Sequence, residues 1–185
     1  MKKGDKLSLI NTKILEIKNE GLEVSVLKKL IKENAVRNDD ISGNVLILSD
    51  RMLQASTLLG NYLESVTKMN FIGVISKLDD LKSVDEKIDY LIIYGYLEDY
   101  DNYNIIDELR KKNNKITTIF YAILSEVVKE DAKSKNIKFL FNRYAPLDML
   151  LLMLERVFNH YDMDDKNGIK VDNGFEKFEF SEWLT

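Results

Sequence analysis

The side chains that could carry chemistry are few in this sequence. Of its 185 residues one is histidine, His160, and none is cysteine. This composition excludes a thiolate metal site, a cysteine nucleophile and a site with several histidines. The acidic run of Asp162, Asp164 and Asp165 lacks the glycine and the closing glutamate that a calcium loop needs at their positions. We therefore expect no metal, no cofactor and no catalytic residue.

Apolar runs suited to buried strands alternate with longer amphipathic stretches through the middle of the chain. The runs are short and rich in Ile, Val, Leu, Phe and Tyr, which is typical of strands covered on both faces. They cover residues 44–49, 70–75, 89–94, 116–122 and 137–141, and the predicted helices between and after them cover 51–67, 77–87, 103–112, 125–134 and 147–161. The alternation predicts an α/β fold with a five-stranded parallel sheet and helices on both faces.

Three segments follow from this pattern. Residues 1–42 are predicted to be a helical N-terminal extension, and residues 36–44 are predicted to be a polar linker that leads into the first strand. Residues 43–158 form the α/β domain, and 159–185 form an acidic linker and an aromatic tail. No glycine-rich turn follows the first strand, so neither a dinucleotide fingerprint nor a phosphate loop is expected.

The ends of the predicted strands resemble, in position, those of the receiver domain of bacterial response regulators, a flavodoxin-like fold. In that family the first strand ends in an acidic pair that binds magnesium, and the third ends in the aspartate that accepts a phosphoryl group. Here the first strand ends in Ser49 and Asp50. The third runs from Asp89 through four apolar residues to Tyr94. A phenol cannot replace a carboxylate in acyl-phosphate chemistry.

The fourth and fifth strands depart from the family pattern as well. Where the family has a Ser or Thr, the fourth strand has Tyr121, and where it has a lysine the fifth is followed by Asn142 and then Arg143. The resemblance therefore implies a pseudo-receiver with a filled, inert phosphorylation pocket around Ser49, Asp50, Tyr94, Tyr121 and Asn142. The loop acids Glu98, Asp99 and Asp101 could replace the acceptor, but solvation of an exposed loop is their simpler role.

Without catalysis, function is expected to lie in surfaces. The helix predicted at 147–161 is more apolar than one buried face requires, and receiver relatives commonly dimerise through their fourth and fifth helices. The aromatic tail could dock in a groove or add to a sheet edge. The predicted interface residues are Leu147, Leu150, Leu151, Leu154, Phe175, Phe178, Phe180 and Trp183. Alternatively, the N-terminal helices or the tail cover this surface within one chain.

The favoured function is a regulatory module for protein–protein interaction and dimerisation, with a homodimer and a regulatory protein as partners. The alternative is a small DNA-binding regulator, because residues 1–38 carry nine Lys or Arg against five Asp or Glu. Its phosphate contacts would be Lys28, Lys29, Lys32 and Arg37. No apolar stretch is long enough for a signal peptide or a membrane span, so a cytoplasmic protein is expected.

Overall fold

The computed structural model describes residues 21, 23–31, 37–97, 99–123, 126–137, 139–142 and 154. The elements are, in order, β1 (Asn38–Leu48), α2 (Leu53–Val66), β2 (Thr67–Ile75), η1 (Leu78–Ser83), β3 (Tyr90–Tyr94), η2 (Tyr100–Tyr103), α3 (Asn104–Lys112), β4 (Thr117–Ala122), α4 (Glu126–Ser134) and β5 (Phe139–Asn142). Residues 21 and 23–31 are also helical, and we call this segment the N-terminal helix.

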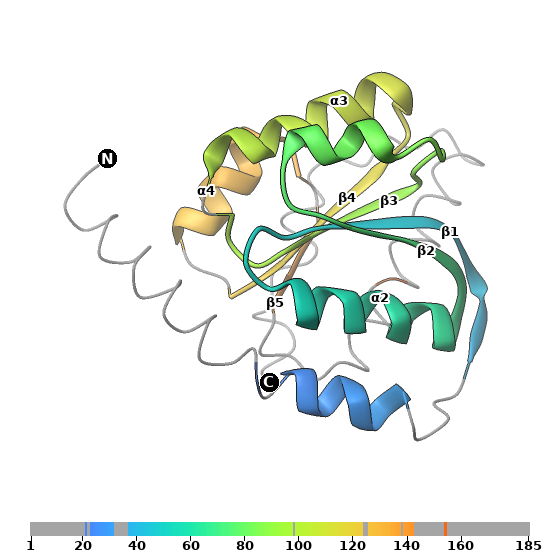
Figure 1. The fold of residues 1–185 in the computed structure, drawn as a ribbon. Coiled ribbons are helices and arrows are strands. Elements are labelled where there is room, and N and C mark those ends of the chain that lie inside the picture. Colours follow the sequence, from blue (N-terminus) through green and yellow to red (C-terminus); the bar gives the residue numbers. More distant parts are fainter. Residues whose placement is uncertain are drawn as a thin grey trace, which may run out of the picture.

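The five strands form one sheet in the order β2-β1-β3-β4-β5, and every neighbouring pair is parallel. The helices α3 and α4 lie on one face of the sheet, and α2 and the N-terminal helix lie on the other (Figure 1). The predicted fold class is therefore confirmed. Within the described ranges, no helix is both long and apolar enough to cross a membrane.

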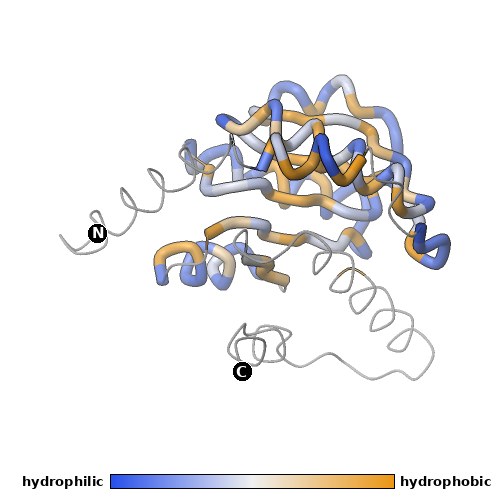
Figure 2. Tube along the Cα trace, turned by 90° about the horizontal axis from the view of Figure 1, so that it is seen from below, coloured by the Kyte–Doolittle hydropathy of each residue, from blue (hydrophilic) through white to orange (hydrophobic). Residues whose placement is uncertain are grey.

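Two hydrophobic clusters flank the sheet, one on each face. Strand β3 divides its side chains between them: Leu91 and Ile93 belong to the cluster under η1, α3 and α4, whereas Tyr90, Ile92 and Tyr94 belong to the cluster under α2. This division follows from the alternation of side chains along a strand. In Figure 2 hydrophobic and hydrophilic residues alternate along the helical segments, as expected for helices with one buried face.

Strand β1 begins at Asn38, so the prediction of a polar linker over residues 36–44 was wrong. Its first half pairs with β2 in a register that joins Asn38 to Thr67 and Ser42 to Lys68, with a bulge between the two pairs. Ile41 is buried in the cluster under α2 and anchors this half. One apolar residue among polar neighbours carries too little periodicity to predict a strand. Residue 43, the predicted start of the domain, therefore lies inside β1.

The segment between β2 and β3 differs from the helix predicted over residues 77–87. Only η1, a short 3-10 helix over Leu78–Ser83, forms there. The carboxylate of Asp80 accepts hydrogen bonds from the backbone N–H of Ser76, at 2.9 Å, and of Lys77, at 3.1 Å. The Ser83 hydroxyl donates to the Asp80 carbonyl at 2.7 Å. Such local side-chain bonds compete with a continuing α-helix.

Helix α2 leads directly into β2 through Thr67, which is both the residue after the helix and the first of the strand. Its hydroxyl donates to the Leu63 carbonyl at 2.6 Å and accepts from the Met69 backbone N–H at 3.0 Å. This turn without a loop explains why β2 begins three residues before the predicted strand at Asn70. Of the helix predicted at 147–161, the structure describes Leu154 alone, which is helical.

Candidate functional site

The carboxyl ends of the parallel strands bring several of the predicted pocket residues to one edge of the sheet. Tyr94 ends β3 and is paired in register with Tyr121 of β4, and Asn142 ends β5 beside Ala122. The rings of Tyr94 and Tyr121 are tilted against each other with their centroids 5.3 Å apart. The two tyrosines therefore pack against each other on the face of the sheet that α2 covers.

Ser49, directly after β1, is buried and holds the start of α2. Its backbone N–H donates to the Ile75 carbonyl at 3.0 Å, and its hydroxyl accepts from the Met52 N–H at 3.2 Å. A hydroxyl that accepts a bond near the start of a helix satisfies a donor that the helix itself leaves open. The arrangement gives Ser49 a structural role at the start of α2.

Asp50 joins the end of β1 to the loop after β3. Its carboxylate accepts a hydrogen bond from the Asp99 backbone N–H at 3.3 Å. The Asp99 side chain in turn accepts from the Asp101 N–H at 3.0 Å and caps η2. Asp99 and Asp101 are exposed, whereas Glu98 lies outside the described residues. These acids therefore build the loop through their contacts with backbone donors.

Tyr94, at the end of β3, is buried. Its side chain is only 2% exposed, and its hydroxyl donates a hydrogen bond to the carboxylate of Glu23 in the N-terminal helix. Leu27, four residues further along this helix, lies in the same hydrophobic cluster as Tyr94. Residues four apart share one face of a helix. The N-terminal helix therefore contacts the end of β3 through Glu23 and adds Leu27 to the hydrophobic cluster on the same face of the sheet.

Sequence reasoning missed Glu23. The only available signal was its spacing from Leu27, which places an acid on the apolar face of the N-terminal helix. An acid in such a place calls for a buried donor, and the phenol of Tyr94 is that donor.

Leu154 was predicted as an interface residue, and the structure corrects this prediction. The side chain is 0% exposed and belongs to the cluster that also contains Leu27 of the N-terminal helix. The other predicted interface residues lie outside the described residues: Leu147, Leu150, Leu151, Phe175, Phe178, Phe180 and Trp183.

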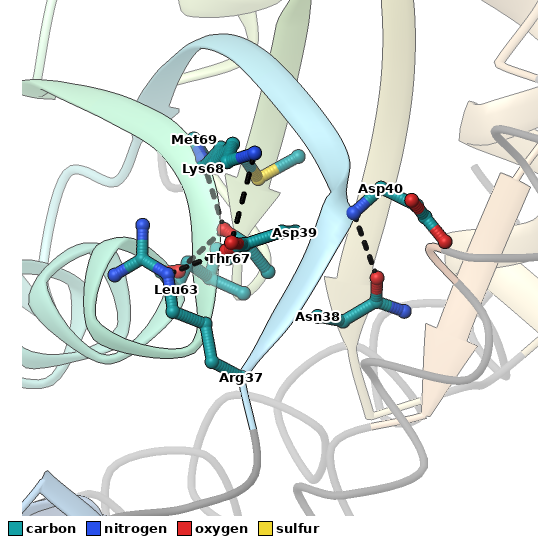
Figure 3. Close-up of polar contacts among 8 residues, drawn as sticks. All are labelled: Arg37, Asn38, Asp39, Asp40, Leu63, Thr67, Lys68 and Met69. Atoms are coloured by element: carbon teal, nitrogen blue, oxygen red, sulfur yellow. Dashed lines mark hydrogen bonds and ion pairs between the residues drawn. The ribbon is translucent and has the colours of Figure 1, made fainter.

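The four residues predicted to contact nucleic acid differ from one another in exposure and in their contacts. Lys28 and Lys29 are exposed on the N-terminal helix, and Lys32 lies outside the described residues. The Arg37 side chain donates to the carboxylate of Asp39 at 2.6 Å, and Lys68 lies 3.6 Å from the same carboxylate (Figure 3). The hydrogen bond from Arg37 holds the pKa of Asp39 below its usual value. The charge of Arg37 is thus already offset.

On the opposite face of the sheet, the loop after β3 is fastened to α4. Burial raises the pKa of Asp131 despite a hydrogen bond from the phenol of Tyr96, and burial also raises the pKa of Tyr96. Tyr100 lies 3.4 Å from the Ser134 hydroxyl, and the Lys135 ammonium lies 5.3 Å from the centre of its ring. Among the described residues no cluster of three or more acidic or histidine side chains could hold a metal ion.

Comparison with solved structures identifies the fold. The receiver-like fold is shared with NtrX from Brucella abortus in complex with ATP, with a TM-score of 0.54, 14% identity and coverage of 68% of this chain and 29% of that one. It is shared also with the response regulator DrrB of Thermotoga maritima, an OmpR/PhoB homologue, with a TM-score of 0.51, 12% identity and coverage of 65% and 54%.

A receiver domain protein from Methanospirillum hungatei JF-1, described as CheY-like, gives a TM-score of 0.50 at 12% identity, with coverage of 67% of this chain and 99% of that one. This chain therefore matches the whole of a single receiver domain but only about half of DrrB and less than a third of NtrX. No protein-family model matches the sequence. The comparison with curated proteins finds no match either.

Proposed function

We propose that this chain is a phosphorylation-independent pseudo-receiver that acts as a regulatory module for protein–protein interaction and dimerisation. The observation that carries the proposal is the state of Tyr94. A phenol stands at the end of the third strand, buried against Tyr121 and hydrogen-bonded to Glu23. Acyl-phosphate formation requires a carboxylate that a donor molecule can reach, and this position offers neither.

The residues near Tyr94 also support the proposal that the chain is not phosphorylated. A magnesium ion takes oxygen ligands in an octahedral arrangement, commonly with one or two carboxylates. At the end of β1 the hydroxyl of Ser49 is engaged with the Met52 N–H, and the carboxylate of Asp50 with the Asp99 N–H. These polar groups hold backbone in place. Because the polar groups at the carboxyl ends of the strands are engaged in this way, a chain with the receiver-like fold would signal by binding a partner.

Exposure to a small-molecule phosphodonor tests the loss of phosphorylation. The chain is incubated with acetyl phosphate and Mg²⁺ beside a phosphorylatable receiver domain as positive control, and intact mass is measured. We expect the mass of the receiver domain to rise by one phosphoryl group and the mass of this chain to stay unchanged. A hydroxylamine-sensitive phosphoryl group on Asp50 or Asp99 would contradict the proposal.

Light scattering coupled to gel filtration tests dimerisation. The whole chain is used, because a truncation after residue 42 would cut through β1. We expect the mass of a dimer at micromolar concentration. A monomer at every accessible concentration would contradict the dimerisation part of the proposal and leave the phosphorylation result untouched.

The DNA-binding alternative has one observation in its favour, the exposure of Lys28 and Lys29 side by side on one helix. Anisotropy of labelled duplex DNA, measured over a series of salt concentrations, tests it. Phosphate contacts would give an affinity that falls steeply with salt and is weakened by the double substitution Lys28→Glu and Lys29→Glu. We expect no such binding, and its appearance would favour the alternative.

A further inference from the structure

The outer surface of α2 is unusual because it carries no charge over most of its length. Helix α2 reads LQASTLLGNYLESV, so its first charged residue is Glu64 near its end. In the whole chain 31% of residues are charged. Leu53 at the start of the helix is 51% exposed, and Gln54 and Thr57 beside it are also exposed. The exposed side of α2 is therefore uncharged up to Glu64 and presents one exposed leucine.

A shallow groove of about 400 Å³ runs along this surface beside the N-terminal helix. It is lined by Lys28, Leu53, Gln54, Thr57 and Leu58. Lys28 is the only charged residue among these lining residues. The groove therefore offers apolar contact with one cation at its wall, which fits an aromatic segment that carries acidic residues.

We propose that this groove binds the chain's own aromatic tail, residues 175–184. The tail reads FEKFEFSEWL and holds three glutamates and one lysine. Its rings would supply the rigid anchors that dominate such contacts, and its net negative charge complements Lys28. The inference does not depend on the proposed function, because it concerns contacts within one chain.

The path of the chain allows this contact. Leu154 belongs to the cluster on the face of the sheet that carries α2 and the N-terminal helix, so the chain passes this face. Phe175 follows Leu154 by 21 positions, and a linker of that length spans at most about 70 Å. A tethered segment also meets its site at an effective concentration on the order of millimolar. The tail therefore has an advantage over a separate partner.

The fluorescence of Trp183 provides a direct test, because it is the only tryptophan in the sequence. The emission maximum and acrylamide quenching are measured on the full chain, with circular dichroism to confirm that each variant is folded. We expect blue-shifted, protected emission in the parent. Leu53→Glu and Lys28→Glu should each shift the emission to longer wavelength and increase quenching.

A matched control lies on the other side of the sheet. Leu78 in η1 is 41% exposed, comparable with Leu53, and Leu78→Glu should leave the emission of Trp183 unchanged. Solvent-exposed emission in the parent would overturn the proposal. So would protected emission that neither groove variant changes.

Dilution separates contact within one chain from contact between two. Protection that is constant with concentration supports the proposal, whereas protection lost on dilution would place the tail of a second copy in the groove and overturn the intramolecular contact. The readout uses neither phosphorylation nor oligomer mass, so failure here is distinct from failure of the proposed function.

Discussion

The phenol of Tyr94 makes two separable contacts, a ring contact with Tyr121 and a hydrogen bond to Glu23. Tyr94→Phe keeps the first and removes the second. Because the acceptor is a carboxylate, we expect a loss of about 1.5–3 kcal/mol in the free energy of unfolding, measured with urea. In a double-mutant cycle Tyr94→Phe and Glu23→Ala, which removes the acceptor, should together cost less than the sum of their single effects. Strict additivity would contradict the hydrogen bond.

The raised pKa of Asp131 predicts how the stability of the folded chain depends on pH. Its pKa is raised in the folded chain, chiefly by burial, and one of its carboxylate oxygens has no hydrogen-bond partner among the described residues. Above about pH 4 the unfolded chain loses this proton first, so the folded state binds more protons and stability falls as pH rises. The stability that the raised pKa of Asp131 contributes is fully present below the pKa of this group in the unfolded chain. It is lost as pH rises through the pKa of the group in the folded chain.

The variant Asp131→Asn cannot titrate at this position, so we expect its stability relative to the parent to increase between pH 4 and pH 7. Urea unfolding at a series of pH values measures this difference, in which the other carboxyl groups cancel. A constant difference would show that the buried carboxylate does not titrate as described. Asp85→Asn, at an exposed residue between η1 and β3, serves as the control.

At this scale the sequence predicted which residues stand at the strand ends but not what they contact. Tyr94 and Tyr121 could be placed at one edge because each ends a clear apolar run. The hydrogen-bond partner of Tyr94, Glu23, comes from 71 residues earlier in the chain, and no local pattern links residues so far apart. The bond from Asp99 to Asp50 was missed for the same reason.

The N-terminal helix is held on the domain by Leu27, which is 1% exposed and lies in the cluster under α2. Leu27→Ala should cost about 2–5 kcal/mol of stability, because it removes a buried side chain and leaves a cavity. Val26 is the matched control, since it is next in sequence and 39% exposed, and Val26→Ala should change stability by less than about 0.5 kcal/mol. Equal effects in urea unfolding would contradict the docking of the helix.

Gly60 lets α2 approach β2. A methyl group at this position would come within 2.3 Å of the Phe71 ring. We therefore expect Gly60→Ala to lower the melting temperature, although alanine favours a helix by about 1 kcal/mol over glycine. In a Phe71→Ala background the clash is absent, so Gly60→Ala should raise the melting temperature there. A loss in both backgrounds would contradict this explanation.

Helices and strands were predicted correctly where a segment had a dense apolar pattern. The prediction failed where local polar hydrogen bonds or pairing with a neighbouring strand determined the structure. All five strands were found, because each contains several buried apolar residues. The first half of β1 was missed since it depends on pairing with β2, and the helix predicted at 77–87 was wrong since Asp80 bonds to the backbone before it. Pairing and side-chain caps are not visible in periodicity.

For the whole molecule, the sheet order predicts how stability is distributed. Strands β1, β3 and β4 are paired on both sides, and β2 and β5 form the edges. Residues 38–43 pair with β2 only, since the pairing of β1 with β3 begins at Val45. Hydrogen exchange should therefore be slowest in β3 and β4, faster in residues 38–43, and fastest in the N-terminal helix, which lies on the outside. Uniform protection would contradict this order.

The contact between Glu23 and Tyr94 also has a consequence for synthesis. A ribosome adds about 5–20 residues per second, so the 71 residues between the two take roughly 4–14 s. The last residue of the N-terminal helix, Ile31, is added early in this interval, yet the strand that the helix contacts does not exist, and Leu27 has no core to enter. During each round of translation this amphipathic segment is therefore available to other binders before its own domain can receive it.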